Sequence, residues 1–388
     1  MKTALALKYR PQNFFDVVGQ EANVRILSNA VKDDRLPNAL LVSGTRGTGK
    51  TSVLRIVAKA INCESRVNGY EPCNECDSCK RVTESRDTDV LEIDGASYGR
   101  IDQIRELQEQ LLFPPQFSKY KIIIIDEIHA MSQAAFQALL KIVEEPPVYA
   151  IFMFATTEFN KVPETITTRC LRLSFSRVSE LDIVNRISYI ASNEGLVCDV
   201  KALRLIAREA RGSIRDSITI MEQTSLFGDI VYNNVLEVLG RTDVTEYLKL
   251  LDCIVRGSAT DMIALYKEII HSSTGDAMDM VVSLATLYKN MLIVKNHGSM
   301  SSIDGTKETY ERLKTYAKEF TLEGLEKSFE ILASFTARTA NMLNLEVTLL
   351  QLLPAKSVEN VLVKKVLQDF EGRTRDAFEA EPVEYTEL

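Results

Sequence analysis

The segment Gly44-Thr-Arg-Gly-Thr-Gly-Lys50-Thr51 has the residue types and the spacing of a phosphate-binding loop. It follows the apolar run Ala39–Val42 and precedes the helix-like segment Ser52–Lys59, which is the context that the motif requires. Its glycines let backbone N–H groups turn toward the phosphates of a nucleotide, and a helix N-terminus adds a favourable dipole. We expect Lys50 to reach the β- and γ-phosphates and the Thr51 hydroxyl to bind Mg²⁺. The sequence therefore predicts that the chain binds a nucleoside triphosphate.

The next informative segment is Lys121-Ile-Ile-Ile-Ile-Asp126-Glu127, an apolar run that ends in two acidic residues. A continuous β-branched run of this kind is typical of a strand that is buried on both faces of a parallel sheet. The two carboxylates lie at its carboxyl end, where open α/β sheets bind their ligands. Asp126 suits Mg²⁺ coordination, and Glu127 suits polarising the water that attacks the phosphate. The alternative is that the two carboxylates only cap the next helix.

Four of the seven cysteines are grouped in the pattern C-x9-C-x2-C-x2-C, namely Cys63, Cys73, Cys76 and Cys79. Two-residue spacings let thiolates converge on one tetrahedral ion, and four thiolates would leave no open position for water. We therefore predict a structural Zn²⁺ site, with unligated surface thiols or a redox role as the alternatives. The remaining cysteines, Cys170, Cys198 and Cys253, are expected to be ordinary buried thiols.

Composition excludes some classes of protein. The chain has 388 residues, 45% of them hydrophobic, and 46 basic against 54 acidic residues, which gives a net charge of −8. A chain with this charge is not a general nucleic-acid clamp, so any DNA contact must come from a local basic patch. No signal peptide and no membrane span are expected, because Lys8 and Arg10 interrupt the first apolar stretch and no apolar run approaches about 18 residues. We expect a cytoplasmic protein.

Residues 1–178 alternate strand-like and helix-like segments, which indicates a parallel sheet covered by helices. The expected strands are Ala39–Ser43, Asp89–Ile93, Ile122–Asp126, Ala150–Thr156 and Cys170–Phe175. The expected helices are Val24–Lys32, Lys50–Ile61, Arg100–Leu112, Gln133–Glu144 and Pro163–Thr168. The predicted class is thus α/β in this part, with the cysteine knuckle of residues 63–79 inserted into it.

The remainder of the chain reads as helical. Residues 179–242 contain the amphipathic segments Leu181–Glu194, Val200–Ala210 and Ser213–Thr224, with a shorter one at Tyr232–Leu239, and we expect a small helical domain. Residues 243–369 form a second helical domain with long periodic runs, among them Leu322–Met342 and Leu345–Leu353. Residues 370–388 carry five glutamates and one aspartate against two arginines, which predicts a disordered acidic tail.

Several further segments match the motifs of one protein family. They are Tyr9–Gln20 at the front, Leu139-Leu-Lys-Ile-Val-Glu-Glu-Pro-Pro147, Ala155-Thr-Thr157, Thr168-Arg169-Cys170, Gly212-Ser-Ile-Arg215-Asp216 and Leu345–Leu350. Together with the glycine loop and the four cysteines, they closely resemble the AAA+ family of γ/τ subunits of the bacterial DNA polymerase III clamp loader. The resemblance covers roughly residues 5–355. The knuckle between the glycine loop and the acidic strand makes it specific.

The resemblance implies a role for each matching residue. Lys50, Asp126 and Glu127 would be catalytic with Thr157 as the first sensor, Arg215 as the second sensor of the same chain, and Arg169 as the arginine finger for a neighbouring subunit. Thr168 stands where the family has Ser, and it keeps the hydroxyl. The nucleotide would contact Tyr9, Arg10, Pro11, Val17, Val18, Gly44, Thr45, Arg46, Gly47, Thr48, Gly49, Lys50, Thr51, Ser52 and Arg215. Mg²⁺ would be held by Thr51 and Asp126.

Several of these residues also have a plainer interpretation. Arg169 could form a surface ion pair, Arg215 could act within its own helix, and Thr157 could be a strand-end hydroxyl satisfied by backbone. Arg100 and Lys141 match basic DNA-contacting positions of the family, whereas Tyr98 and Gly99 depart from it, and both basic residues could be ordinary solvated charges.

The resemblance also implies a helical lid over residues 179–242, a helical collar for oligomerisation over residues 243–369, and use of ATP, Mg²⁺ and structural Zn²⁺. The expected partners are δ-type and δ′-type subunits, further copies of the chain, a sliding clamp and primer–template DNA. A non-hydrolysing scaffold subunit and a DNA-remodelling AAA+ helicase are the alternatives. The three histidines, at positions 129, 271 and 297, show no metal spacing and are expected to be incidental.

Overall fold

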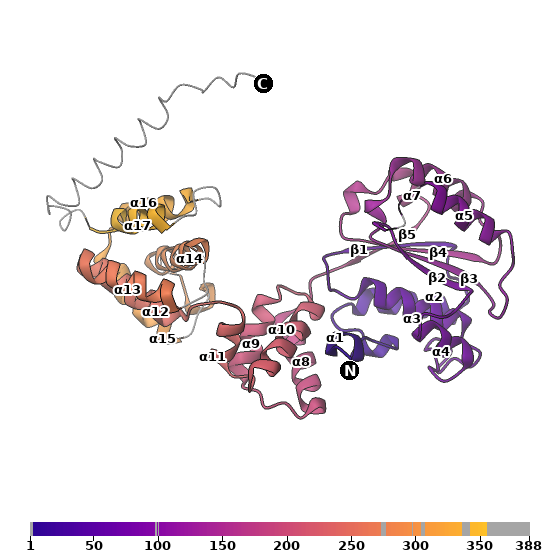
Figure 1. The fold of residues 1–388 in the computed structure, drawn as a ribbon, viewed down its shortest axis with the longest axis horizontal. Helices are drawn as coiled ribbons and strands as arrows, with labels where there is room; N and C mark the ends of the chain where they lie inside the picture. Colours follow the sequence, from indigo (N-terminus) through magenta and orange to yellow (C-terminus); the bar gives the residue numbers. More distant parts are fainter. Residues whose placement is uncertain are drawn as a thin grey trace, which may run out of the picture. The chain divides into compact units, whose positions relative to one another are not determined.

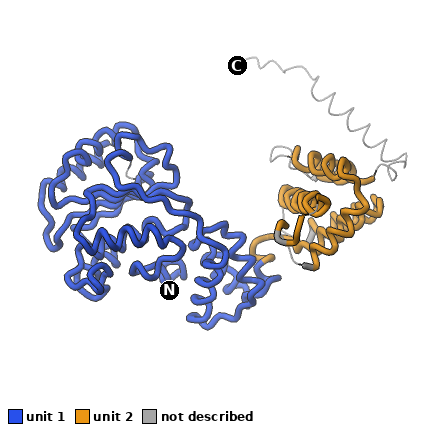
Figure 2. The backbone as a smooth tube through the Cα atoms, turned by 180° about the vertical axis from the view of Figure 1, so that it is seen from behind, with its two compact units in different colours: residues 1–235 blue, residues 236–388 orange. Residues whose placement is uncertain are grey.

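The computed structural model describes residues 3–97, 99, 101–272, 277–296, 298–303, 307–335 and 342–354. The chain divides into two compact units, Met1–Val235 and Leu236–Leu388, which Figure 2 shows in different colours. Each unit is described by itself below.

The first unit is built on a five-stranded sheet. Its strands are β1 (Ala39–Gly44), β2 (Val90–Asp94), β3 (Lys121–Asp126), β4 (Ala150–Thr156) and β5 (Leu171–Phe175). Their order in the sheet is β2-β3-β4-β1-β5, and every neighbouring pair is parallel. The predicted parallel sheet is confirmed, and each strand lies within a residue of its predicted bounds.

Helices cover both faces of this sheet (Figure 1). Alternate side chains of each strand point to opposite faces, so Leu40 and Val42 of β1 pack with α2 (Glu21–Lys32) and α3 (Lys50–Asn62) in one core. Leu41 of β1 faces the other core, which contains residues of α5 (Ile101–Leu111), α6 (Gln133–Glu144) and α7 (Glu164–Thr167). Because both faces are covered, the strands are continuous apolar runs.

Short elements connect this frame. They are α1 (Leu5–Lys8), η1 (Phe14–Asp16), α4 (Asp77–Thr83), η2 (Ile128–Ala130) and η3 (Phe159–Lys161). Helix α4 was not predicted from the sequence; it starts directly after Cys76, within the cysteine knuckle.

Three helices follow the sheet, as predicted: α8 (Glu180–Glu194), α9 (Val200–Glu209) and α10 (Ile214–Phe227). Side chains of the residues that precede each helix accept a hydrogen bond from its first turn, namely Ser179, Asp199 and Ser213. The next helix, α11 (Tyr232–Val238), contains the division between the two units. A domain boundary at residue 242 therefore stays a prediction.

The second unit is helical. It contains α12 (Val244–Arg256), α13 (Ala259–Ser272), α14 (Ala277–Lys295), η4 (Met300–Ser302), α15 (Lys307–Glu319), α16 (Leu322–Ser334) and α17 (Met342–Gln351). Its core surrounds the buried rings of Tyr266 and Tyr288. The expected single run Leu322–Met342 is wrong in extent, since α16 ends at Ser334 and Phe335 adopts an extended conformation that buries its ring in this core. Residues 355–369 and the predicted tail 370–388 lie outside the described residues.

One helix of the second unit, α14, is long and apolar enough to cross a membrane by length and composition alone. The buried share of its most apolar window is 44%, and α14 packs on α15 and α16. A core helix meets the same criteria, so this observation is weak evidence for a membrane span.

Candidate functional site

The glycine loop connects the end of β1 to the start of α3. Gly47 has φ +77° and Gly49 has φ +95°, conformations that L-residues rarely adopt. A Cβ atom on Gly44 would lie 2.5 Å from the backbone oxygen of Phe175, so the neighbouring strand β5 also requires glycine there. Nothing lies within 4 Å of the Cβ position at Gly49. The loop therefore has the backbone geometry and the open space that a phosphate group needs.

Lys50 is the first residue of α3 and is 6% exposed. Its Nζ donates to the backbone oxygens of Gly44, at 2.9 Å, and Thr45, at 3.0 Å. Burial lowers the pKa of Lys50, while the carboxylates of Glu127 and Asp126 oppose this effect. Neutral carbonyl groups are weak partners for a buried ammonium group, and an anionic phosphate would be a stronger one.

Thr51 and Asp126 come together from α3 and the end of β3. The Thr51 hydroxyl donates to Asp126 Oδ2 at 2.7 Å, although the two residues are 75 positions apart. The other carboxylate oxygen, Oδ1, accepts the Glu127 N–H at 3.0 Å. A hydroxyl and a carboxylate are hard oxygen ligands, and their contact beside Lys50 fits a Mg²⁺ ion.

Glu127 lies at the end of β3 in a left-handed backbone conformation, with φ 47° and ψ 46°. Its Oε2 accepts hydrogen bonds from the backbone N–H of Thr157, at 3.1 Å, and from the Thr157 hydroxyl, at 2.9 Å. Left-handed conformations outside glycine are often found at functional sites, because the surroundings must hold them in place. The structure thus brings together the predicted water-polarising residue and the predicted first sensor.

His129 lies on η2, two residues after Glu127, and belongs to no motif in the sequence. Its Nδ1 is 3.3 Å from Glu127 Oε2 and 3.1 Å from the Thr156 hydroxyl, and its Nε2 is 3.3 Å from Glu158 Oε1. The structure therefore places His129 in contact with the predicted water-polarising residue. The side chain of residue 271 and the whole of residue 297 lie outside the described residues.

The lid helix α10 begins directly on the glycine loop. The Gly47 backbone oxygen accepts the N–H groups of Ile214, at 3.1 Å, and Arg215, at 3.4 Å. A Cβ atom on Gly47 would lie 1.9 Å from Ser213 Oγ, so the contact leaves no room for a side chain. The exposed Arg215 side chain therefore projects from a helix turn that is bonded to the phosphate loop itself.

The N-terminal segment lies between α3 and α8. Arg10 Nε donates to the Ser52 hydroxyl at 3.1 Å, and burial lowers the pKa of Arg10. The Tyr9 hydroxyl donates to Glu194 at 2.6 Å, and the Tyr9 backbone oxygen accepts from Arg186 at 2.9 Å. Pro11, Val17 and Val18 are partly buried in the same segment.

Two of the three remaining basic residues of interest, Arg169 and Lys141, lie away from these contacts. Arg169 follows α7, is 40% exposed, and bonds to the Thr165 oxygen and, at 2.5 Å, to Glu144 of α6. Lys141 is exposed on α6. Arg100 and its neighbour Tyr98 lie outside the described residues.

The four cysteine sulfurs of the knuckle, those of Cys63, Cys73, Cys76 and Cys79, all lie within 4.8 Å of one another. Zn–S bonds of about 2.3 Å in a tetrahedron place sulfurs about 3.8 Å apart, and the Cys73 and Cys79 sulfurs are 4.0 Å apart. Burial opposes ionisation of Cys73, but the N–H groups of Cys76 and Glu75 outweigh it and lower its pKa to about 7. This geometry fits a four-thiolate zinc site.

Two of the other three cysteines differ from expectation. Cys253 is buried as predicted, but Cys170 and Cys198 are only partly buried. Cys170 follows α7 at the margin of the sheet, where its thiol donates to the backbone oxygen of Ile166 at 3.2 Å.

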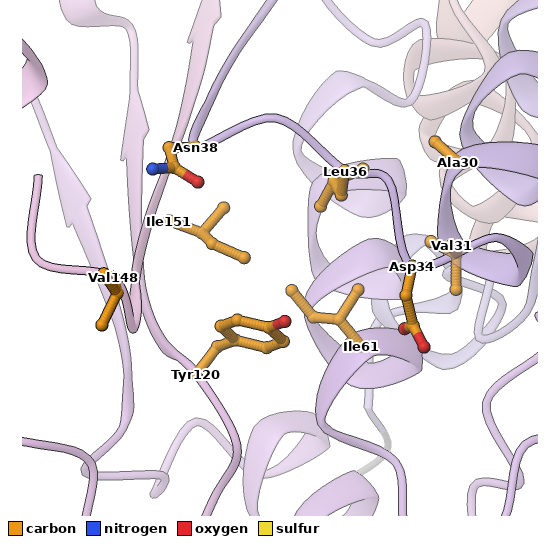
Figure 3. A pocket seen from close by; sticks show the side chains of 9 residues that line it. All are labelled: Ala30, Val31, Asp34, Leu36, Asn38, Ile61, Tyr120, Val148 and Ile151. Carbon is orange, nitrogen blue, oxygen red and sulfur yellow. The ribbon is translucent and has the colours of Figure 1, made fainter.

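A cavity of about 100 Å³ lies elsewhere in the first unit (Figure 3). Asn38, Tyr120 and Ile151 of its lining stand at the amino ends of β1, β3 and β4, with Leu36 and Ile61 nearby. The glycine loop and Asp126 stand at the carboxyl ends, so this cavity belongs to the opposite edge of the sheet.

Comparison with known proteins matches nearly the whole chain to replication proteins. Family models match over residues 19–179 (DNA polymerase III, delta subunit), 182–229 (DNA polymerase III clamp loader subunit, ATPase lid domain) and 230–364 (DNA polymerase III subunits gamma and tau domain III). The gamma subunit from Buchnera aphidicola of Schizaphis graminum is 31% identical over 331 residues, which are 84% of this chain and 90% of that protein. The chain belongs to the DNA polymerase III gamma/tau family.

Other members of the family are longer. The tau subunit of Bacillus subtilis is 36% identical over 331 residues, which are 85% of this chain but 58% of that protein. The chain thus spans about half the length of the tau subunits that it matches. Among solved structures, Thermotoga maritima RuvB is 19% identical and covers 67% of this chain and 85% of its own, with a TM-score of 0.45, which is too low to support an argument.

Proposed function

We propose that this chain is an ATP-hydrolysing motor subunit of a DNA sliding-clamp loader, which opens the clamp and places it on primer–template DNA during replication. One observation carries the proposal: in a member of the gamma/tau family, the residues that would bind phosphate, metal and water lie at the carboxyl ends of β1, β3 and β4, three adjacent parallel strands. Thr51 bonds to Asp126, and Glu127 bonds to Thr157. A scaffold subunit without turnover would not need this set.

The proposed chemistry depends on positioning and charge, because phosphoryl transfer needs little covalent help from the protein. Lys50 would bind the β- and γ-phosphates, and Thr51 with Asp126 would hold Mg²⁺, which supplies neutralising charge when bound. Glu127 would polarise the attacking water, and Thr157 would orient Glu127 through the two hydrogen bonds that it donates.

Two arginines would complete the site. Arg215, on the lid helix that bonds to Gly47, would act as the sensor within the same chain. Arg169 would serve the ATP of a neighbouring subunit, since its described contacts are with Thr165 and Glu144. An ion pair as exposed as the one between Arg169 and Glu144 stabilises a protein by only about 0–1 kcal/mol, so the arginine can exchange partners easily.

Other parts of the chain would have supporting roles. The segment with Tyr9, Arg10, Pro11, Val17 and Val18 would contact the adenine. The knuckle would hold one structural Zn²⁺, and Arg100 and Lys141 would contact DNA phosphates without sequence specificity. We propose a cytosolic complex of further copies of this chain with δ-type and δ′-type subunits, held together through the helical second unit.

The test is steady-state ATP hydrolysis by the chain assembled with its partner subunits, with and without sliding clamp and primed DNA. We expect strong stimulation by clamp and primer together. The Arg169→Ala variant should lose about three orders of magnitude of turnover, as arginine fingers typically contribute that much or more. A low rate that does not respond to clamp would refute the motor function and favour a scaffold, and stimulation by branched DNA alone would favour a remodelling motor.

A further inference from the structure

His129 is held rigidly beside the acidic pair. It is the middle residue of η2, whose first residue, Ile128, is fully buried. The backbone N–H of Ala130 donates to the backbone oxygen of Glu127 at 2.9 Å and closes this turn. The His129 side chain is 14% exposed. An imidazole placed this way cannot swing freely, and its two nitrogens face fixed partners.

Those partners are two carboxylates and one hydroxyl. Nε2 lies 3.3 Å from Glu158 Oε1, and a carboxylate can only accept, so a hydrogen on Nε2 would have an acceptor there. Nδ1 faces both Glu127 Oε2, at 3.3 Å, and the Thr156 hydroxyl, at 3.1 Å. In the protonated ring Nδ1 donates toward both oxygens, and in the neutral ring it accepts from Thr156. Only a hydrogen on Nδ1 can be donated to Glu127 Oε2, so His129 connects Glu127 to the end of β4 when Nδ1 carries one.

The contacts of Glu127 are one-sided. Oε2 takes the two hydrogen bonds from Thr157 and the contact with His129, whereas Oε1 has no hydrogen bond among the described residues. A carboxylate fixed through one oxygen presents the other in a defined direction. Such a group can accept a proton or orient a water without first losing rotational freedom.

We propose that His129 is a positioning residue for Glu127: it acts with Thr157 to fix Oε2 so that Oε1 faces the reacting water. The inference rests on the proposed function, in which Glu127 polarises that water. His129 touches neither the glycine loop nor Asp126 in its described contacts, and of the residues with a proposed role in hydrolysis it contacts Glu127.

The test compares three substitutions in the assembled complex. His129→Asn places an amide nitrogen where Nδ1 stands and keeps the contact with Glu127. His129→Gln places its amide near Nε2 and keeps only the contact with Glu158, and His129→Leu removes both. We expect His129→Gln and His129→Leu to lower kcat about tenfold and His129→Asn to stay within about threefold of wild type, as expected for lost positioning of one group. The affinity for a fluorescent ATP analogue should stay within about twofold in all three.

A double-variant comparison tests whether the effect passes through Glu127. In a Glu127→Gln background, His129→Leu should cause no further loss in single-turnover hydrolysis, because the group that it positions is already gone. A further tenfold loss there, an unchanged kcat in His129→Leu, or equal losses of kcat and nucleotide affinity in all three substitutions would each overturn the inference. Wild-type complex without turnover would refute the proposed function itself, a result that is distinguishable from any behaviour of the variants.

Discussion

The contact between Gly47 and the lid helix gives a prediction that needs no nucleotide. The first N–H groups of a helix have no acceptor within the helix, so the Ile214 N–H depends on the Gly47 oxygen for its hydrogen bond. In the Gly47→Ala variant, a Cβ atom 1.9 Å from Ser213 Oγ would force the loop and the lid apart. We expect the first turn of α10 to lose its protection against hydrogen exchange.

The magnitude follows from three local losses. An alanine at φ +77° costs about 1 kcal/mol in backbone strain. Displacing Ser213 breaks its cap on the Asp216 N–H, worth about 1 kcal/mol, and separating the loop from Ile214 removes a hydrogen bond of about 1 kcal/mol. The losses other than strain, about 2 kcal/mol, correspond to roughly thirtyfold in the local opening equilibrium.

Gly195→Ala is the matched control. Gly195 ends α8 with φ +65°, and nothing lies within 4 Å of its Cβ position, so alanine there introduces the strain without the clash. Hydrogen–deuterium exchange of the Ile214 amide should accelerate about thirtyfold in Gly47→Ala and change less than threefold in Gly195→Ala. Equal exchange rates in the two variants would refute the claim that the Gly47 contact holds the lid on the loop.

Three further predictions concern the rest of the chain. Asp89→Ala removes a fully buried carboxylate that accepts hydrogen bonds from the backbone N–H groups of Gln116, Phe117 and Ser118. The free energy of unfolding in urea should therefore fall by about 3 kcal/mol. A fall below about 1 kcal/mol would contradict a stabilising role for this carboxylate. Elemental analysis should find one zinc per chain. The Cys79→Ser variant should lose the zinc and have a lower Tm, whereas the control variant Cys253→Ser should retain the zinc. A full zinc content in Cys79→Ser would argue against the four-thiolate site. Burial raises the pKa of Cys170 to about 12, so iodoacetamide should label it slowly at pH 8 until the chain is unfolded, and rapid labelling of the folded chain would count against this. The pKa of the Cys170 thiol is about 9 in the unfolded chain and about 12 in the folded chain. The contribution of the protonated thiol to stability is therefore complete below about pH 9 and is lost as the pH rises toward 12.

Much of the fold could be predicted because the relevant signals are local. The strands are continuous apolar runs, and the lid helices start at Ser179, Asp199 and Ser213, whose side chains cap them. The end of α16 could not be predicted, since the periodic pattern continues while Phe335 leaves the helix to enter the core. The knuckle helix α4 could not be predicted, because a helix of seven residues is too short to show a helical period in the sequence.

In the candidate site, too, some residues could be predicted from the sequence and others could not. Lys50, Thr51 and Asp126 carry a recognisable motif, and the structure brings them together. His129 carries none, because its significance depends on which residues end the neighbouring strand. Only the pairing of β3 with β4 places Thr156 and Glu158 against it. Spacing along one segment cannot show such a contact across strands.

The charged side chains of Lys50, Asp126 and Glu127 each have a neutral hydrogen-bond partner within the chain. Lys50 bonds to two loop carbonyls, Asp126 to Thr51, and Glu127 to Thr157. An unpaired buried charge costs several kcal/mol, so these internal bonds stabilise the site until ligands replace them. In the proposed function, Lys50 and Thr51 would exchange these partners for a phosphate and a metal ion, whereas Glu127 would keep its bonds from Thr157 and its contact with His129. Binding and the orientation of Glu127 are therefore carried by separate contacts, and a variant in either set should alter one without the other.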